Sequence, residues 1–263
     1  MVMEQPDKDA KISVRGLKMA FGSFVVMNDL NFDVQKEDIF VIMGGSGCGK
    51  STLLRHMIGL KEPAEGSVFY EGENFTTADG EERLKYIRRF GVMYQSGALW
   101  SSMTLAENIT MPMEEHTDLK PAEIKDLAYY KLALVGLSGY EDYYPAQVSG
   151  GMNKRAGIAR ALALDPEVLF LDEPGAGLDP LSSQRLDELI LRLRDSLGST
   201  FVIVTHELAS IFAIANNSIF LDTGTRTQGA TGDPKELLEQ TENETVRLFL
   251  NRGETMKPET NHE

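Results

Sequence analysis

Residues 44–52 read Gly44-Gly45-Ser46-Gly47-Cys48-Gly49-Lys50-Ser51-Thr52, which fits the pattern G-x-x-x-x-G-K-[ST]. The apolar run 39–43 before it predicts a buried strand, and residues 51–58 after it predict a helix. Glycines in such a loop let several backbone N–H groups aim at one point, and the helix start adds positive potential. The loop therefore predicts a triphosphate site, where Lys50 reaches the β- and γ-phosphates and Ser51 binds Mg²⁺. The alternative is a bare glycine-rich turn, and the strand and helix context disfavours it.

Composition limits the class of protein. The chain has 263 residues, 42% of them hydrophobic, which is enough for one large domain with a subdomain. Its net charge of −14 disfavours a nucleic-acid partner, because phosphate binding needs a basic surface. The acidic residues are spread along the chain, which indicates a solvated surface rather than a metal cluster. The single cysteine, Cys48, allows no internal disulfide and fits a reducing compartment.

The sequence offers no membrane segment of its own. Residues 1–9 lack the charged and apolar regions of a signal peptide, and no apolar run approaches the length that spans a bilayer. If the protein works at a membrane, we expect other chains to do the spanning.

Strands that alternate with helices predict an α/β fold with a mostly parallel sheet. Alternating apolar and polar residues over 11–35 predict an antiparallel β subdomain before this core, and a helical pattern over 96–165 predicts an inserted helical subdomain. The other expected elements are strands at 66–70, 90–94, 168–171, 201–205, 218–222 and 226–229, a turn at 71–74, and helices at 80–89, 105–113, 121–137, 149–164, 181–197, from 207, 233–240 and 242–251. The expected domains are a tail over 1–10, a nucleotide-binding domain over 11–252 and a polar tail over 253–263.

An acidic pair, Asp172 and Glu173, ends the apolar run 168–171. A strand that ends in acid presents it at the carboxyl edge of the sheet, where α/β folds bind ligands. We expect Asp172 to hold Mg²⁺ and Glu173 to act as general base toward a water in line with the γ-phosphate. A solvent-facing pair is the alternative, and the phosphate loop in the same chain disfavours it.

Ser149-Gly150-Gly151 precedes a helical pattern and predicts a second anion-binding helix start, with Ser149 as the cap. One ATP on the first loop does not need it, so these residues alone favour an ordinary helix cap.

Three further residues stand at expected element ends. His206 follows strand 201–205 and could contact a γ-phosphate, although a lone histidine is more often structural. Gln95 follows strand 90–94 and could reach Mg²⁺ or the attacking water. Phe21 could stack on adenine, with a core or exposed aromatic as the alternative. None of the histidines has metal-ligand spacing to another His or Cys.

Together these residues resemble the ATP-binding-cassette (ABC) ATPases, which have a RecA-like P-loop NTPase core, in the same order over 11–252. By this resemblance Phe21 is the adenine-stacking aromatic, residues 44–52 are the Walker A loop, Gln95 is the Q-loop glutamine, Ser149-Gly150-Gly151 is the signature loop, residues 168–173 are Walker B, Asp179 belongs to the D-loop, and His206 is the switch histidine. Val148 and Met152 depart mildly from the pattern, where Leu and Gln are commoner.

The resemblance implies ATP hydrolysis by a homodimer with Mg²⁺. The signature loop of one copy would close on the ATP held by the Walker A loop of the other, which gives Ser149 a use. Cys48, inside the phosphate loop, should then react with a thiol reagent, which would inhibit, and ATP should protect it.

Residues 94–119 carry a narrower resemblance, to the ATPases of bacterial phospholipid transporters of the Mla (toluene-tolerance) group. It rests on Gln95-Ser96-Gly97-Ala98-Leu99-Trp100, then Asn108, Pro112 and Glu115-His116-Thr117, with support from Met152 and residues 246–250. This implies a peripheral subunit on the cytoplasmic face of the inner membrane, with 96–115 lining the groove for a permease helix. Its implied partners are a permease, a lipid-binding MCE-type protein and a STAS-domain subunit.

Other functions remain open. The runner-up is the ATPase of a solute or amino-acid importer. A soluble ABC ATPase acting on nucleic acid or ribosomes is disfavoured by the single cassette, the acidic balance and the lack of sustained heptads. A small-molecule P-loop kinase would have no use for Ser149-Gly150-Gly151 or His206.

Overall fold

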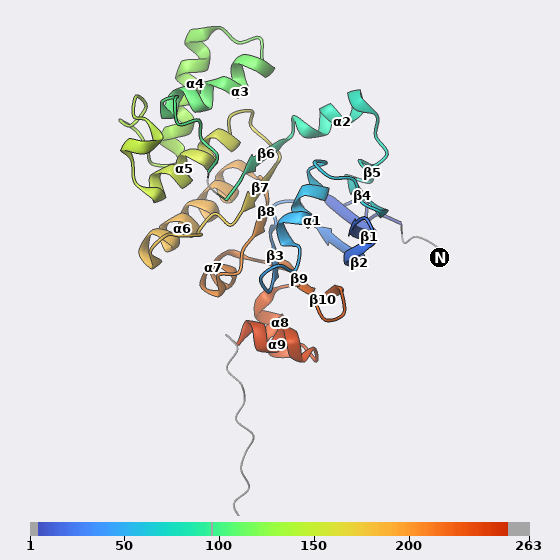
Figure 1. Cartoon of the computed structure of the whole chain (residues 1–263). Helices are drawn as coiled ribbons and strands as arrows, with labels where there is room; N and C mark the ends of the chain where they lie inside the picture. The colour runs from blue at the N-terminus through green and yellow to red at the C-terminus, as the bar shows by residue number, and fades with distance from the viewer. Residues whose placement is uncertain (1–4, 96, 252–263) are drawn as a thin grey trace, which may run out of the picture.

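The computed structural model describes residues 5–95 and 97–251. Its centre is a six-stranded sheet in the order β10-β9-β3-β8-β7-β6 (Figure 1). The strands are β3 (Ile39–Gly44), β6 (Phe90–Met93), β7 (Val168–Asp172), β8 (Thr200–Val204), β9 (Asn217–Asp222) and β10 (Thr227–Thr231). Neighbours are parallel except β9 and β10, which are antiparallel. The predicted α/β fold with a mostly parallel sheet is confirmed.

The central sheet is buried on both faces because its strands are apolar without interruption. Along β3, Ile39, Val41 and Met43 enter one buried cluster, while Phe40 and Ile42 enter the other. This alternation follows from side chains pointing to opposite faces of a strand. The carboxyl ends of the strands therefore project from a packed base.

The second sheet is antiparallel and comes mainly from the N-terminal part of the chain. Its order is β2-β1-β4-β5. The strands are β1 (Ile12–Phe21), β2 (Phe24–Val34), β4 (Glu65–Tyr70) and β5 (Glu73–Asn74). One expectation is wrong here: only half of 71–74 is a turn, because Asn74 and Glu73 pair with Phe69 and Tyr70 as a short strand.

Helices occupy the stretch between β6 and β7, and no strand occurs among residues 97–165. They are α3 (Leu105–His116), α4 (Pro121–Leu134), the 3-10 turn η1 (Pro145–Gln147) and α5 (Gly150–Ala161). In Figure 1, α3, α4 and α5 gather on the side of the molecule away from the antiparallel sheet. The helix expected over 121–137 ends early, because Gly136 adopts a φ of 70°.

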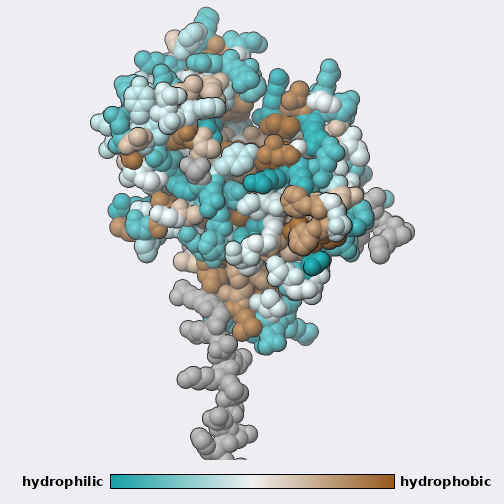
Figure 2. Space-filling view, in the orientation of Figure 1, coloured by the Kyte–Doolittle hydropathy of each residue, from teal (hydrophilic) through white to brown (hydrophobic). Residues whose placement is uncertain are grey.

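The other helices are α1 (Lys50–Met57), α2 (Gly80–Ile87), α6 (Pro180–Leu197), α7 (Leu208–Ile214), α8 (Pro234–Gln240) and α9 (Glu244–Leu250). None of the described helices has both the length and the apolar character needed to cross a bilayer. Figure 2 shows hydrophilic residues over most of the face in view, with hydrophobic residues in separate patches.

Candidate active site

Four adjacent parallel strands end at the site. Lys50 follows β3, His206 follows β8, Glu173 follows β7 and Gln95 follows β6, and the sheet order places these strands side by side. Residues that are far apart in sequence therefore meet at one sheet edge, the usual ligand edge of an α/β fold.

The loop between β3 and α1 depends on glycine at two positions. Gly44 has a φ of 147°, and a Cβ there would lie 2.7 Å from the carbonyl oxygen of Leu221. Gly49 caps α1 with a φ of 100°, and a Cβ there would lie 2.8 Å from Val26. Side chains at either position would displace the loop, so these glycines set its path.

Lys50 and Ser51 make specific contacts within the site. The Lys50 side chain is buried, and its ammonium donates to the carbonyl oxygens of Gly44 and Gly45, both at 3.0 Å. The Ser51 hydroxyl donates to Asp172 Oδ1 at 2.9 Å. The first helical turn of α1 is thus joined to the acidic end of β7.

Glu173 and His206 form a pair across two strand ends. Glu173 Oε1 lies 2.8 Å from His206 Nδ1, and since a carboxylate only accepts, the histidine donates. The other oxygen, Oε2, is buried and has no hydrogen-bond partner among the described residues. Glu173 also has a φ of 50°, a conformation that costs energy outside glycine and that occurs at functional sites. Its unpartnered oxygen can accept a hydrogen bond from a water or ligand.

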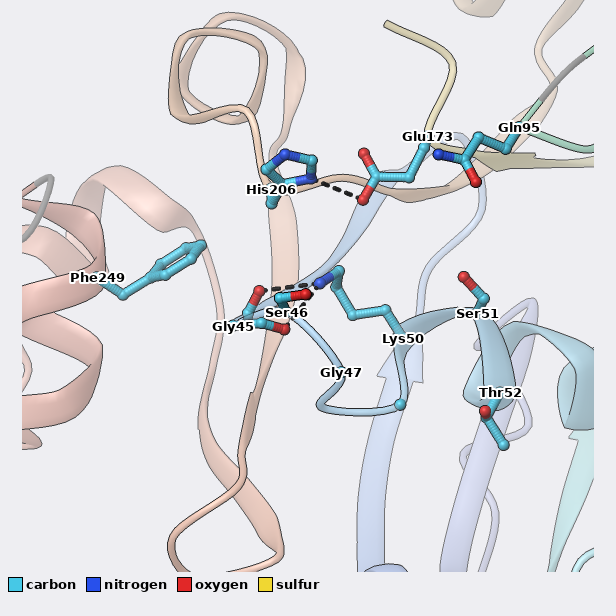
Figure 3. A pocket seen from close by; sticks show the side chains of 12 residues that line it. Gly45, Ser46, Gly47, Lys50, Ser51, Thr52, Gln95, Glu173, His206 and Phe249 are labelled. Carbon is cyan, nitrogen blue, oxygen red and sulfur yellow. Dashed lines mark hydrogen bonds and ion pairs between the residues drawn. The ribbon is translucent and has the colours of Figure 1, made fainter. Parts of the chain in front are cut away.

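These residues surround an open cavity of about 580 Å³. It is lined by Gly44, Gly45, Ser46, Gly47, Gly49, Lys50, Ser51, Thr52, Gln95, Glu173, His206 and Phe249. Figure 3 shows the Lys50 ammonium, the Ser51 hydroxyl and the Glu173 carboxylate around it. The sequence reasoning missed Phe249, which comes from α9 and packs edge-on against Phe220 at 5.2 Å between ring centroids. In the sequence, Phe249 was noted only as part of segment 246–250, which supports the resemblance to the Mla group.

The predicted signature residues lie elsewhere. The Ser149 hydroxyl accepts from the Met152 N–H at 3.3 Å and caps α5, and Ser149 and Gly151 line a second hollow beside α6 rather than the first cavity. Gly150 is the first residue of α5, and Asp179 caps α6 by accepting from the N–H groups of Leu181 and Ser182. Within one chain, the start of α5 and the start of α1 therefore line different cavities.

Phe21 does not line the cavity in this structure. The residue is 55% exposed at the end of β1, and the Lys61 ammonium lies 2.9 Å from the centroid of its ring. Stacking of Phe21 on adenine stays a prediction.

Cys48 is inside the loop as expected but does not face the cavity. The residue is 1% exposed, and its Sγ lies 2.8 Å from the position that a Cβ on Gly44 would take. Burial raises the pKa of the Cys48 thiol, an effect that the Lys50 charge only partly offsets. The expectation that a thiol reagent inhibits through Cys48 is therefore corrected. The thiol is buried, and its raised pKa lowers the fraction present as the reactive thiolate.

We expect the native protein to react with a thiol reagent at least about tenfold more slowly than the unfolded chain, and faster as the pH rises toward the raised pKa. Labelling followed by intact mass measures both rates. Equal rates in native and unfolded protein would contradict the burial of Cys48.

The oxygens at this edge suit a magnesium ion. A hydroxyl and a carboxylate, from Ser51 and Asp172, already adjoin each other, and hard oxygens are the ligands that Mg²⁺ prefers. In the described part of the chain, no group of three or more His, Cys, Asp or Glu forms a metal cage. Mg²⁺ usually keeps several waters and is shared with substrate phosphates.

A family model described as ABC transporter matches residues 27–176. The fold and the cavity are those of a nucleotide-hydrolysing cassette, and the chain belongs to the ABC transporter family as an ATP-binding, ATP-hydrolysing member.

Three similar proteins illustrate the range of relatives. The intermembrane phospholipid transport system ATP-binding protein MlaF of Haemophilus influenzae is 36% identical over 94% of this chain and 92% of its own length. The probable ribonucleotide transport ATP-binding protein mkl of Mycobacterium leprae is 39% identical over 91% of this chain, which spans 68% of the relative. A dimeric ATP-binding cassette in a post-hydrolysis state, bound to ADP and Pi, superposes with a TM-score of 0.75 at 26% identity over 84% of this chain and 98% of that one.

Proposed function

We propose that this protein is the ATP-hydrolysing subunit of a bacterial ABC transporter that moves phospholipid between the inner and outer membranes. The observation that carries the catalytic part is Glu173: its buried Oε2 is unpartnered within the described structure, beside a cavity that also contains the Lys50 ammonium. The transport part is supported by the similarity to MlaF over nearly the whole of both chains.

Each side chain has a role in this proposal. Lys50 exchanges its two carbonyl contacts for the β- and γ-phosphates of ATP, and the N–H groups of residues 45–52 surround them. Ser51, Asp172 and Gln95 hold Mg²⁺, which neutralises phosphate charge when it is bound. Glu173 Oε2 accepts the proton of the attacking water, and His206 orients Glu173 through the bond to Oε1.

The acting unit is a dimer in which each copy contributes to both sites. The reason is that Ser149 does not line the cavity formed by the phosphate loop of its own chain. The anion-binding helix start at Ser149 can therefore contact a nucleotide phosphate only if that nucleotide is bound by a second copy. The similarity to a dimeric ATP-binding cassette bound to ADP and Pi supports a dimer. Asp179, at the start of α6, would then lie near the contact between copies.

The experiment mixes a Lys50→Ala copy with a Ser149→Arg copy, each inactive alone. In a head-to-tail heterodimer both defects fall in one site and the other site is intact. We expect about a quarter of wild-type ATPase activity, since about half of the dimers are mixed and each keeps one of two sites. Activity no higher than that of the separate variants would contradict shared sites.

Segment 97–104 is the proposed contact for the permease. Buried Asn108 accepts from the Trp100 N–H at 2.7 Å and donates to the Thr104 carbonyl at 2.8 Å, so it fixes the path of this loop. Trp100 itself remains 55% exposed. A rigid loop with an exposed aromatic suits an interface with another protein.

The identity of the transported substrate is the most specific part of the proposal. Co-purification from membranes decides it: an MlaE-like permease with an MCE-type lipid-binding protein and a STAS-domain subunit supports phospholipid transport on the cytoplasmic face of the inner membrane. A solute-type permease would favour an importer instead. The experiment is needed because the similar protein mkl is named a probable ribonucleotide transport protein, whereas MlaF is named a phospholipid transport protein.

A further inference from the structure

Lys154 is a buried cation for which the proposed reaction has no use. It lies on α5, five residues after the Ser149 cap, and the residue is 8% exposed. Burial lowers the pKa of its ammonium, while the charges of Glu173, Glu207 and Asp172 act in the opposite direction. Burying an ammonium is costly unless it is well partnered, so its partners indicate what the charge is for.

Among the described residues, both hydrogen-bond partners of Lys154 are backbone carbonyls of cavity residues. The ammonium donates to the carbonyl oxygen of Gln95 and, at 3.4 Å, to that of Glu173. One side chain therefore joins α5 to the ends of β6 and β7, from which Gln95 and Glu173 reach the cavity.

A second set of contacts joins α5 to the segment after Gln95. Arg160 donates to the carbonyl oxygens of Ala98, at 2.5 Å, and Gly97, at 3.3 Å. Gly157 faces Gly97 so closely that a Cβ on Gly157 would lie 3.1 Å from the Gly97 Cα. The helix and this segment are thus packed backbone to backbone, and displacement of one must move the other.

We propose that Lys154 is a positioning residue that couples the helix beginning at Ser149 to Gln95 and Glu173. Closure of a second copy on Ser149 would then set the backbone of the carboxylate that activates water. The inference rests on the proposed function, because it assumes that Glu173 is the base.

The test uses the full chain with Lys154→Met, which keeps the aliphatic stem without the charge, and Lys154→Gln, which keeps an amide donor. Lys131→Met is the matched control, because Lys131 is also buried but pairs with Asp165 in the helical region. The readouts are kcat and KM for ATP, and the fluorescence of Trp100, the single tryptophan of the chain, on addition of Mg²⁺ and a non-hydrolysable ATP analogue.

For Lys154→Met we expect kcat to fall by about 10²-fold, with KM for ATP changed less than about threefold, because the groups that bind phosphate stay in place while the base is misplaced. The nucleotide-dependent change in Trp100 emission should disappear as well. Lys154→Gln should recover at least about tenfold in kcat, and Lys131→Met should keep both the kcat and the Trp100 response.

Three results would overturn the inference: wild-type kcat in Lys154→Met, a Trp100 response that persists in that variant, or no Trp100 response in the wild-type protein. Equal losses in the Met and Gln variants would exclude hydrogen bonding as the means of positioning. Unimpaired turnover in Glu173→Gln would instead refute the proposed base. The Trp100 fluorescence needs no hydrolysis, so it would still test whether Lys154 couples the helix to Gln95 and Glu173.

Discussion

Glu173→Gln should lower ATP turnover by about 10³-fold while ATP binding stays within a few-fold of wild type, because an amide cannot accept the proton of the attacking water. The substitution keeps the shape of the side chain and an oxygen for His206 Nδ1, at 2.8 Å in the native protein. Phosphate release and equilibrium nucleotide binding, measured on the same preparation, separate the two effects.

Glu207→Gln is the matched control. Glu207 lies one residue after His206, but its carboxylate accepts from the Ser183 hydroxyl at 3.1 Å and does not line the cavity. An amide oxygen can still accept that bond, so turnover should stay within a few-fold of wild type. If Glu173→Gln hydrolyses ATP as fast as this control, Glu173 is not the base.

Lys50→Ala should weaken ATP binding by about 10²-fold or more, roughly 3 kcal/mol, since the change removes the one lysine whose ammonium lines the cavity in the described structure. Lys50 is buried, and its stem leads the charge to the carbonyls of Gly44 and Gly45. Isothermal titration with Mg²⁺ and ATP measures the loss.

The folded state of the Lys50 variant needs its own check, because the two carbonyl contacts of the loop disappear with the side chain. Thermal unfolding of Lys50→Ala without nucleotide should therefore be compared with that of Lys131→Ala, a change at another buried lysine. Tight ATP binding by Lys50→Ala would remove Lys50 from the phosphate site.

The sequence was sufficient for the features that have local causes. The phosphate loop was predictable because its glycines, its lysine and the flanking strand and helix are contiguous over 39–58. The Asp172-Glu173 pair was predictable because an uninterrupted apolar strand ends there. The cap at Ser149 follows from a short polar side chain at a helix start, and the structure contains it. The mostly parallel core follows from the alternation of strands and helices.

Tertiary structure alone decided which of these pieces meet. The order β3-β8-β7-β6, which brings Lys50, His206, Glu173 and Gln95 to one edge, is set by crossovers that have no signal in any local window. The same holds for the entry of Phe249, the burial of Cys48 and the contacts of Lys154 with two distant carbonyls. Hydrophobic period and capping act over a few residues, whereas these contacts depend on how whole elements pack, and packing is a property of the complete chain.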